Sequence, residues 1–437
     1  MCLSTFRRIV AFFLSSIVLS LAFANISHAV LELKVSQNRV RFVDCAILPF
    51  RSNALPISQK ISTIIAKDLS FSGVFSVPDS KSFLEKVEFT GIPNFSLWKK
   101  SDTSLIVLGK VEYNKSTESL SISYKLFDVR LKEQVDAFSK VVQVSKWREV
   151  AHTISNRIYQ YTTGRSGYFN TKIAFVKELK KAKKQITKLV ISDYNGENAV
   201  YVTNGRNIVH DPRFTPCGTK LYYIEYWNHR TVVMKLDLES GSVKPVLSLK
   251  GTIFSINFSP DMKKMIFSIA YMGTTGLYEH FFKNGKTVPL LSVKNAIITN
   301  AQYSYDGTRM VFTSDHSGTN RIYFLDATTR KITPVSTGEG QYFTPSYSPD
   351  GSYIAFSKRL GGMFYLGIMK SDGSEERLLN SALLVDNVVW APNGFGMMFS
   401  ARKGNGGISN IYFVDINGHK ESIVANHASS LSWNRMK

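Results

Sequence analysis

Aromatic and apolar positions in the second half of the chain follow a pattern that repeats every 43 to 45 residues. Each unit carries an aromatic residue, then Ser, Thr or Ala, usually Pro, Asp or Asn and Gly, and then a short apolar stretch. Asp and Gly between apolar stretches are typical of a tight turn, since Asp caps nearby backbone and Gly tolerates positive φ. The aromatic residues, which we call the anchors, are Phe214, Phe258, Tyr303, Tyr347, Trp390 and Trp433.

Each unit has room for four short strands, because a second turn follows the first in most units, and this is the size of a propeller blade. Trp433 has no strand after it, whereas residues 172–176 form an apolar strand with no anchor before it. We therefore predict an all-β six-bladed propeller over residues 166–437. Its C-terminal strand should be the innermost strand of the blade that begins near residue 170, which closes the ring and leaves no free edge strand.

The spacing of apolar residues between positions 40 and 165 predicts a small N-terminal α/β domain. Isoleucine and leucine residues between positions 57 and 70 recur at helical spacing, and residues 119–127 alternate as in a half-buried strand. The predicted strands are 40–48, 105–108 (bounded by Gly109), 119–127 and 137–144, and the predicted helices are 57–70 and 146–162. A hinge that contains Gly and Ser at 163–167 should separate this domain from the propeller.

The first 29 residues have the pattern of a secretory signal peptide, which predicts that the chain is exported. Arg7 and Arg8 are followed by an apolar run and by small residues that end at Ala29. We place the cleavage after Ala29, with Ala24 as the alternative. An uncleaved membrane anchor also stays open, although the apolar run is somewhat short of the ~20 residues that a spanning helix needs. Residues 30–39 would then form a loosely attached N-terminal arm.

Composition narrows the class of protein and of partner. With 44% hydrophobic and 20% charged residues, the chain can build a large core and is not expected to be disordered. Its 54 Lys and Arg against 33 Asp and Glu give a net charge of +21. For an exported protein this favours anionic envelope components or acidic proteins over nucleic acid. Of the three Cys residues, Cys2 leaves with the signal, and we expect Cys45 and Cys217 to be unpaired, buried thiols.

A search for catalytic, metal-binding and cofactor-binding patterns gives none. Gly164–Gly167 lacks the spacing of a nucleophile elbow, and the eight His residues show no paired metal-ligand spacing. His152 lies within a predicted helix, where a structural or surface role is expected. The turn residues Asp261, Asp306 and Asp350 recur with the repeat, so capping explains them better than catalysis does. The alternative function is an exported propeller enzyme, of the hydrolase or lactonase type, that acts at the central channel.

Several segments together resemble the TolB family, the periplasmic component of the Tol–Pal system. The resemblance covers the whole mature chain and combines the signal, the α/β domain and the six blades. The segments that carry it are Ala46–Phe50, Ile64–Phe75, Trp98 with Leu105–Val111, and Ala151–Ser155 with Gly164. The resemblance implies a scaffold rather than an enzyme, monomeric within its complex. It would link inner-membrane TolA to the outer-membrane lipoprotein Pal and support outer-membrane integrity and constriction during cell division.

The resemblance also implies that the N-terminal arm binds TolA. By position the arm consists of Val30, Leu31, Glu32, Leu33, Lys34, Val35, Ser36, Gln37, Asn38 and Arg39. Its apolar residues alternate, so it could add as a strand to a partner or lie as an edge strand on its own domain. The family picture is that Pal binding shifts the arm between docked and released states, which couples the two sites.

Pal is implied to bind at the mouth of the central channel. The residues just ahead of each anchor should lead into the innermost strands and form a polar ring there. The candidates are His210, Asp211, Ser255, Thr299, Asn300, Phe343, Thr344, Asp386, Asn387, Ser429 and Ser430. Any of them could instead only satisfy backbone groups at the start of a strand. Asn300 stands where the family leads us to expect an acidic residue, so charge complementarity in this chain should differ.

Overall fold

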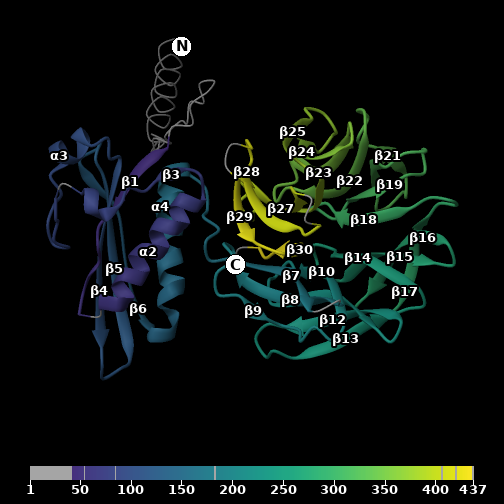
Figure 1. Cartoon of the computed structure of the whole chain (residues 1–437), viewed down its shortest axis with the longest axis horizontal. Helices are drawn as coiled ribbons and strands as arrows, with labels where there is room; N and C mark the ends of the chain where they lie inside the picture. Colours follow the sequence, from purple (N-terminus) through teal and green to yellow (C-terminus); the bar gives the residue numbers. More distant parts are fainter. Residues whose placement is uncertain are drawn as a thin grey trace, which may run out of the picture.

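A computed structural model describes residues 42–53, 55–83, 85–181, 184–404, 407–418 and 421–435. An N-terminal α/β domain and a β-propeller lie side by side (Figure 1). The predicted signal peptide, its cleavage site and the arm at 30–39 lie outside the described residues. Within those residues, none of the helices combines the length and the apolar character that crossing a bilayer requires.

The N-terminal domain is a mixed sheet with two long helices on one face. Its main strand order is β3-β1-β4-β5-β6, with β1 parallel to β3 and β4, and with β2 paired to β4. Helices α2 and α4 lie between this sheet and the propeller (Figure 1). The strands are β1 (Val43–Ile47), β2 (Arg51–Ser52), β3 (Phe75–Ser76), β4 (Leu105–Asn114), β5 (Ser119–Asp128) and β6 (Glu133–Gln143). The helices are α2 (Leu55–Phe71), α3 (Phe95–Lys100) and α4 (Trp147–Thr163), with short 3-10 turns at Ser80–Ser82 and Val144–Lys146.

The predicted helices and strands of this domain are all present, but two strands are longer than predicted: the strand predicted at 137–144 already begins at Glu133. The strand predicted to stop at Gly109 continues through it to Asn114. A Cβ atom on residue 109 would lie 2.2 Å from ring atoms of Phe50. Gly109 therefore serves close packing inside a strand and does not break it. Gly164 does end α4, with a φ of 70°.

The propeller consists of six sheets, each of four antiparallel strands. Five blades run outward along the chain, from an inner strand at the channel to an outer strand. They are β10 (Ile208–Phe214), β11 (Lys220–Trp227), β12 (Arg230–Asp237) and β13 (Val243–Ser248); β14 (Thr252–Phe258), β15 (Lys264–Tyr271), β16 (Thr274–Phe281) and β17 (Thr287–Ser292); β18 (Ile298–Tyr303), β19 (Arg309–Ser314), β20 (Arg321–Asp326) and β21 (Ile332–Pro334); β22 (Gln341–Tyr347), β23 (Tyr353–Leu360), β24 (Met363–Lys370) and β25 (Arg377–Ala382); and β26 (Leu384–Trp390), β27 (Gly396–Arg402), β28 (Asn410–Asp415) and β29 (Glu421–Ala425).

The sixth blade joins the two ends of the propeller segment. Strand β30 (Ala428–Trp433) pairs with β7 (Lys172–Lys181), which continues into β8 (Lys184–Asp193) and β9 (Val200–Tyr201). Trp433 lies opposite Ile173 in the ladder, and the backbone N–H of Asn434 donates to the Lys172 carbonyl at 3.0 Å. The predicted closure of a six-bladed ring by the C-terminal strand is therefore confirmed.

The recurring Asp residues cap the turns that follow the anchors. A serine hydroxyl donates to each carboxylate, over 2.7 Å from Ser259 to Asp261 and over 2.6 Å from Ser348 to Asp350. Backbone N–H groups two residues further on donate to the same oxygens. The hydrogen bond from Ser259 is the main reason why the pKa of Asp261 falls to about 2. Capping accounts for these carboxylates, as predicted.

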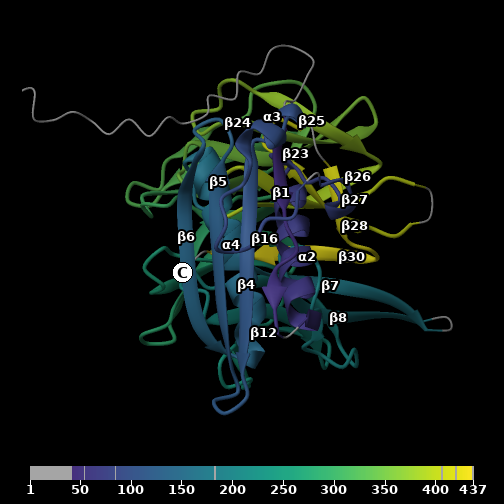
Figure 2. The same ribbon diagram turned by 90° about the vertical axis from the view of Figure 1, so that its left-hand side faces the viewer.

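The segment predicted as a hinge is packed against the helix that precedes it. A Cβ atom on Gly167 would lie 2.3 Å from the Asn156 side-chain oxygen, which also accepts the backbone N–H of Phe169 at 2.9 Å. Tyr168 and Phe169 are almost completely buried. Figure 2 views the N-terminal domain in front of the propeller and shows α4 lying directly behind the sheet strands. Residues 164–166 are exposed, and the chain packs against α4 from Gly167 onward.

Candidate functional site

The candidate ring residues lie inside the innermost strands, not ahead of them. The strands begin earlier than the sequence pattern indicated, and each has a bulge three or four residues before its anchor. At this position five blades have a residue other than glycine with φ between 46° and 54°, a sparsely populated conformation. These residues are Asp211, Asn300, Thr344, Asn387 and Ser430. The blade formed by β14–β17 differs, because its bulge falls at Phe254 and leaves Ser255 in the ladder.

Two of the candidates hold neighbouring blades together. Asp211 is buried, and its carboxylate accepts the backbone N–H of Ile256 in the next blade at 2.7 Å. Ser255 is also buried, and its hydroxyl accepts the backbone N–H of Asn300 at 3.3 Å. Both residues satisfy backbone groups, which is the alternative that the sequence left open. They are poorly placed to contact a partner.

The other candidates are half-buried around the channel. Burial lowers the pKa of His210, and the charge of the nearby Asp211 offsets this effect only in part. Burial raises the pKa of Asp386. The Thr344 hydroxyl is enclosed and finds no partner among the described residues. Ser429 donates to Glu178 at 2.5 Å. The structure does not test whether these residues bind Pal.

A cavity of about 160 Å³ occupies the channel near the turns that follow the anchors, and we call it the anchor-end chamber. Four candidates line it: Ser255, Asn300, Thr344 and Asn387. The remaining seven do not: His210, Asp211, Thr299, Phe343, Asp386, Ser429 and Ser430. The eleven candidate residues therefore lie at different levels along the channel axis, and only four of them reach the chamber.

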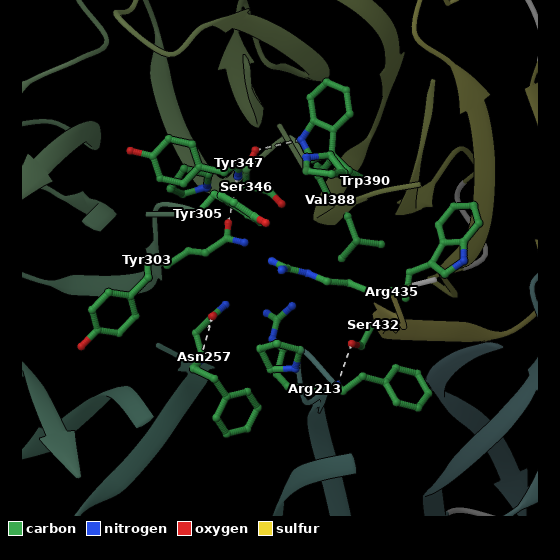
Figure 3. Close-up of a pocket in the computed structure, with 18 of the residues that line it drawn as sticks. Arg213, Asn257, Tyr303, Tyr305, Ser346, Tyr347, Val388, Trp390, Ser432 and Arg435 are labelled. Carbon is green, nitrogen blue, oxygen red and sulfur yellow. Dashed lines mark hydrogen bonds between the residues drawn. The ribbon is translucent and has the colours of Figure 1, made fainter. Parts of the chain in front are cut away.

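Two arginines that the sequence analysis missed point into the anchor-end chamber. The side chains of Arg213 and Arg435 meet in the middle of the view in Figure 3. Arg213 also donates to Asp211 at 2.8 Å. The repeat could have revealed Arg213, since it directly precedes an anchor, and Arg435 follows the last anchor by two residues.

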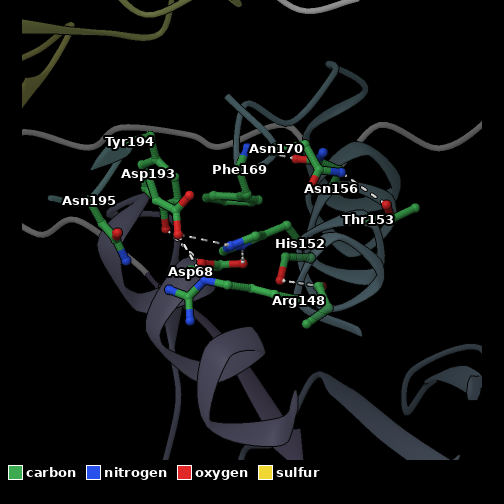
Figure 4. A network of polar contacts seen from close by, with 12 residues as sticks. Asp68, Arg148, His152, Thr153, Asn156, Phe169, Asn170, Asp193, Tyr194 and Asn195 are labelled. Carbon is green, nitrogen blue, oxygen red and sulfur yellow. Dashed lines mark hydrogen bonds and ion pairs between the residues drawn. The ribbon is translucent and has the colours of Figure 1, made fainter. Parts of the chain in front are cut away.

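A buried polar network lies where the N-terminal domain meets the propeller (Figure 4). Asp68 of α2 is fully buried and accepts the Tyr194 hydroxyl of the propeller at 2.7 Å. The Nδ1 atom of His152, on α4, lies 2.7 Å from the second oxygen of Asp68. The structural role predicted for His152 is therefore confirmed. The network ties both helices to the first blade segment.

Arg148 adds ion pairs at the edge of this network. Its guanidinium donates to Asp193 at 2.8 Å and to Glu197 at 2.5 Å, and Lys67 reaches Glu197 at 2.7 Å. Burial alone would raise the pKa values of both carboxyl groups. Lys172 and Arg148 outweigh burial at Asp193, and Lys67 and Arg148 outweigh it at Glu197, so both pKa values are lowered. The pairs thus favour the docked domains above the ordinary carboxyl pKa and lose this effect in acid.

Apolar contacts complete the domain interface. The Phe71 ring lies 5.0 Å from Tyr194 and 4.7 Å from Phe413, measured between centroids. The Arg165 guanidinium stacks over the ring of Phe395, which belongs to the same blade as Phe413. The central carbon of the guanidinium lies 3.3 Å from the ring centroid. One continuous hydrophobic core contains residues of both domains. The interface therefore combines a shared core with a buried polar network, which favours a fixed domain arrangement.

Comparison with known proteins identifies both parts of the chain. The family described as "TolB beta propeller domain" matches residues 159–436, and the family "TolB amino-terminal domain" matches residues 31–135. The chain belongs to the TolB family. TolB is a non-enzymatic component of the Tol–Pal system, so the alternative of a propeller enzyme is set aside. Proteins of this family are typically periplasmic.

Curated TolB proteins and a solved TolB structure agree with this assignment. The "Tol-Pal system protein TolB" of Rickettsia prowazekii is 36% identical over 448 residues, covering 98% of this chain and 99% of that protein. The TolB of Rickettsia akari is 34% identical and covers 86% of this chain and 88% of the relative. The crystal structure of TolB from Acinetobacter baumannii has the same fold, with a TM-score of 0.83 at 24% identity, covering 91% of this chain and 97% of that one.

The two cysteines in the described part of this TolB family member differ in their surroundings. Both thiols are free, and Cys45 is buried as predicted. Cys217 is exposed, so that prediction was wrong: it occupies the turn position that Asp holds in other blades. Hydrogen bonds with the Thr215 and Thr219 hydroxyls lower the pKa of Cys217 to about 7, whereas burial raises that of Cys45 to about 12.

We expect Cys217 to react with iodoacetamide in the native protein while Cys45 does not. The thiolate is the nucleophile, so the rate should rise with pH and reach half its maximum near the Cys217 pKa of about 7. Mass spectrometry of quenched samples would give the rate at each pH. Cys217→Ser is the control and should leave the folded chain unlabelled. A midpoint near the ordinary thiol value of about 8.5 would contradict the effect of the two threonine hydroxyls.

Proposed function

We propose that this chain is a periplasmic scaffold that links inner-membrane TolA to the outer-membrane lipoprotein Pal. It would thereby support outer-membrane integrity and constriction during cell division. The observation that carries the proposal is TolB family membership across both domains. The rigid interface around Asp68 supports it, because a scaffold that joins two partners must hold their binding sites in a fixed relation.

For TolA we propose the arm formed by residues 30–39. The arm precedes β1 in the sequence, and Phe42, the first described residue, is 45% exposed. The apolar positions of the arm alternate, as a segment that adds to a sheet edge requires. Coupling between this arm and Pal binding would act through the domain interface, the contact region that joins the two domains.

For Pal we propose the channel mouth at which the inner strands begin. Asp211 and Ser255 contribute indirectly, since both are buried and used between blades. The residues proposed to face Pal are His210, Thr299, Asn300, Phe343, Thr344, Asp386, Asn387, Ser429 and Ser430. Most of them are neutral polar groups, so we propose an interface that depends on shape and hydrogen bonds more than on ion pairs. Cleavage after Ala29 and a monomeric state within the complex belong to the same proposal.

Deleting residues 30–39 is expected to abolish TolA binding and to leave Pal binding within about twofold, because separate regions of the chain are involved. Isothermal titration of the mature chain against each purified partner would measure both affinities. Equal loss of both affinities would contradict the assignment of the arm.

The reverse test places a large charge at the proposed Pal surface. Thr299→Arg, on the inner strand β18, should weaken Pal binding by about tenfold or more and leave TolA binding unchanged. Thr333→Arg is the matched control, since Thr333 is exposed on the outer strand β21 of the same blade. Equal Pal affinity of the two variants would count against this mouth as the Pal site.

A further inference from the structure

The lining of the anchor-end chamber is cationic. Among the described residues that line it, two are arginines, Arg213 and Arg435, and none is Asp or Glu. The rest of the polar lining comes from amide and hydroxyl side chains of the inner strands and the turns. Three lining residues, Asn300, Thr344 and Asn387, also belong to the set proposed to face Pal, whereas the two arginines do not. The chamber therefore adjoins the proposed Pal surface, and the arginines distinguish it.

Hydrogen bonds within the lining turn donor groups toward the cavity. The side-chain oxygen of Gln302 accepts the backbone N–H of Tyr347 at 2.9 Å. The side-chain oxygen of Asn257 accepts the backbone N–H of Phe258 at 2.8 Å. Each amide has then committed its oxygen to the protein and keeps its NH2 group as a free donor. In Figure 3 the nitrogen of Asn257 points toward the centre of the cavity.

Both guanidinium groups have N–H donors that no described residue accepts. Arg213 gives one bond to Asp211, and its Nε–H is enclosed without a partner among the described residues. Arg435 lies with its guanidinium 5.8 Å from the centre of the Tyr305 ring, and no described carboxylate pairs with it. Since Asp211 balances the charge of Arg213, Arg435 is the arginine of the chamber that has no acidic partner among the described residues. An enclosed donor and a cation without such a partner both favour an anionic occupant.

We propose that the anchor-end chamber binds a compact oxyanion between Arg213 and Arg435. The ligand class is a phosphate or a small polycarboxylate, because guanidinium groups bind both through paired N–H donors. Size agrees with this class: the cavity measures about 160 Å³, and a cavity of about 150 Å³ holds one benzene molecule. Neither arginine belongs to the residues proposed to face Pal, so anion binding and Pal binding can be tested by different substitutions and either proposal can fail without the other.

The test is isothermal titration of the full mature chain with sodium phosphate and, separately, with citrate, in chloride of matched ionic strength. We expect saturable binding of at least one of the two, and the one preferred identifies the class of ligand. Arg435→Gln should weaken that binding by about tenfold or more, because it removes the cation that has no acidic partner among the described residues. Arg435 lies near the chain end and makes few contacts, so this variant should fold normally.

Arg213→Gln should weaken binding by a similar factor, but it also takes a partner from Asp211, so its thermal transition must be compared with that of the parent chain. Arg230→Gln is the matched control, because Arg230 is exposed on β12 and lies outside the chamber. It should bind within about twofold of the parent. Absence of saturable binding with both anions would overturn the proposal. Equal weakening by Arg230→Gln and Arg435→Gln would do the same, since that pattern reflects net charge alone.

Discussion

A chain that lacks residues 428–437 is expected to lose the cooperative thermal transition of the propeller. The deletion removes β30, in which Leu431 is fully buried and Trp433 is 8% exposed, and it leaves the inner edge of β7 unpaired. Losing these side chains and one ladder should cost at least about 6 kcal/mol, which is comparable to the total stability of an ordinary domain. Differential scanning calorimetry with circular dichroism would measure the effect.

Removing only residues 436–437 is the control for this deletion, because it leaves β30 and its bonds to Lys172 intact. This shorter deletion should melt like the full mature chain. If the chain without 428–437 still melted cooperatively at an unchanged temperature, ring closure by the terminal strand would not hold the propeller together.

Asp68→Ala is expected to lower the free energy of unfolding by about 2–5 kcal/mol. The substitution leaves the buried Tyr194 hydroxyl and the buried His152 ring nitrogen without their partner, and both lie in the contact region between the domains. Chemical denaturation followed by tryptophan fluorescence would give the difference. Proteolysis should also become faster at the junction near residue 165, because the domains separate more readily.

A double-mutant cycle separates the polar network from simple loss of volume. Tyr194→Phe removes the hydroxyl that Asp68 accepts, so Asp68→Ala should cost less in that background than in the parent chain. Asp68→Asn keeps an acceptor and should be milder than Asp68→Ala. A change below about 0.5 kcal/mol for Asp68→Ala would mean that water replaces the carboxylate without penalty.

The repeat made the architecture predictable from sequence. The anchors fix the number of blades, and Trp433 together with the strand at 172–176 leaves only one way to close the ring. Local patterns also identified both long helices of the first domain. The boundary at Gly109 was wrong because its explanation is the Phe50 ring, which is more than fifty residues away in the sequence. No local pattern carries that information.

The channel was harder to predict than the ring around it. Residues such as Asp211 and Thr344 take a left-handed backbone conformation because the bulge in the folded blade requires it. Asp and Asn adopt this conformation more readily than other non-glycine residues, so Asp211, Asn300 and Asn387 carry a weak signal, whereas Thr344 and Ser430 carry none. The exposure of Cys217, in contrast, was predictable from the sequence, because aligning the repeats places this residue at a turn. The contact of Asp68 with Tyr194 joins residues 126 positions apart and follows only from the packed domains.

The pairing of β30 with β7 also has a consequence for biosynthesis. Lys172 and Asn434 are separated by 262 positions, so the ring cannot close until strand β30 has been synthesised. Contacts this distant along the chain form slowly. A polypeptide that carries β7 but has not yet paired it with β30 would therefore stay open for a time. The order of the strands delays closure of the ring until both β7 and β30 are available.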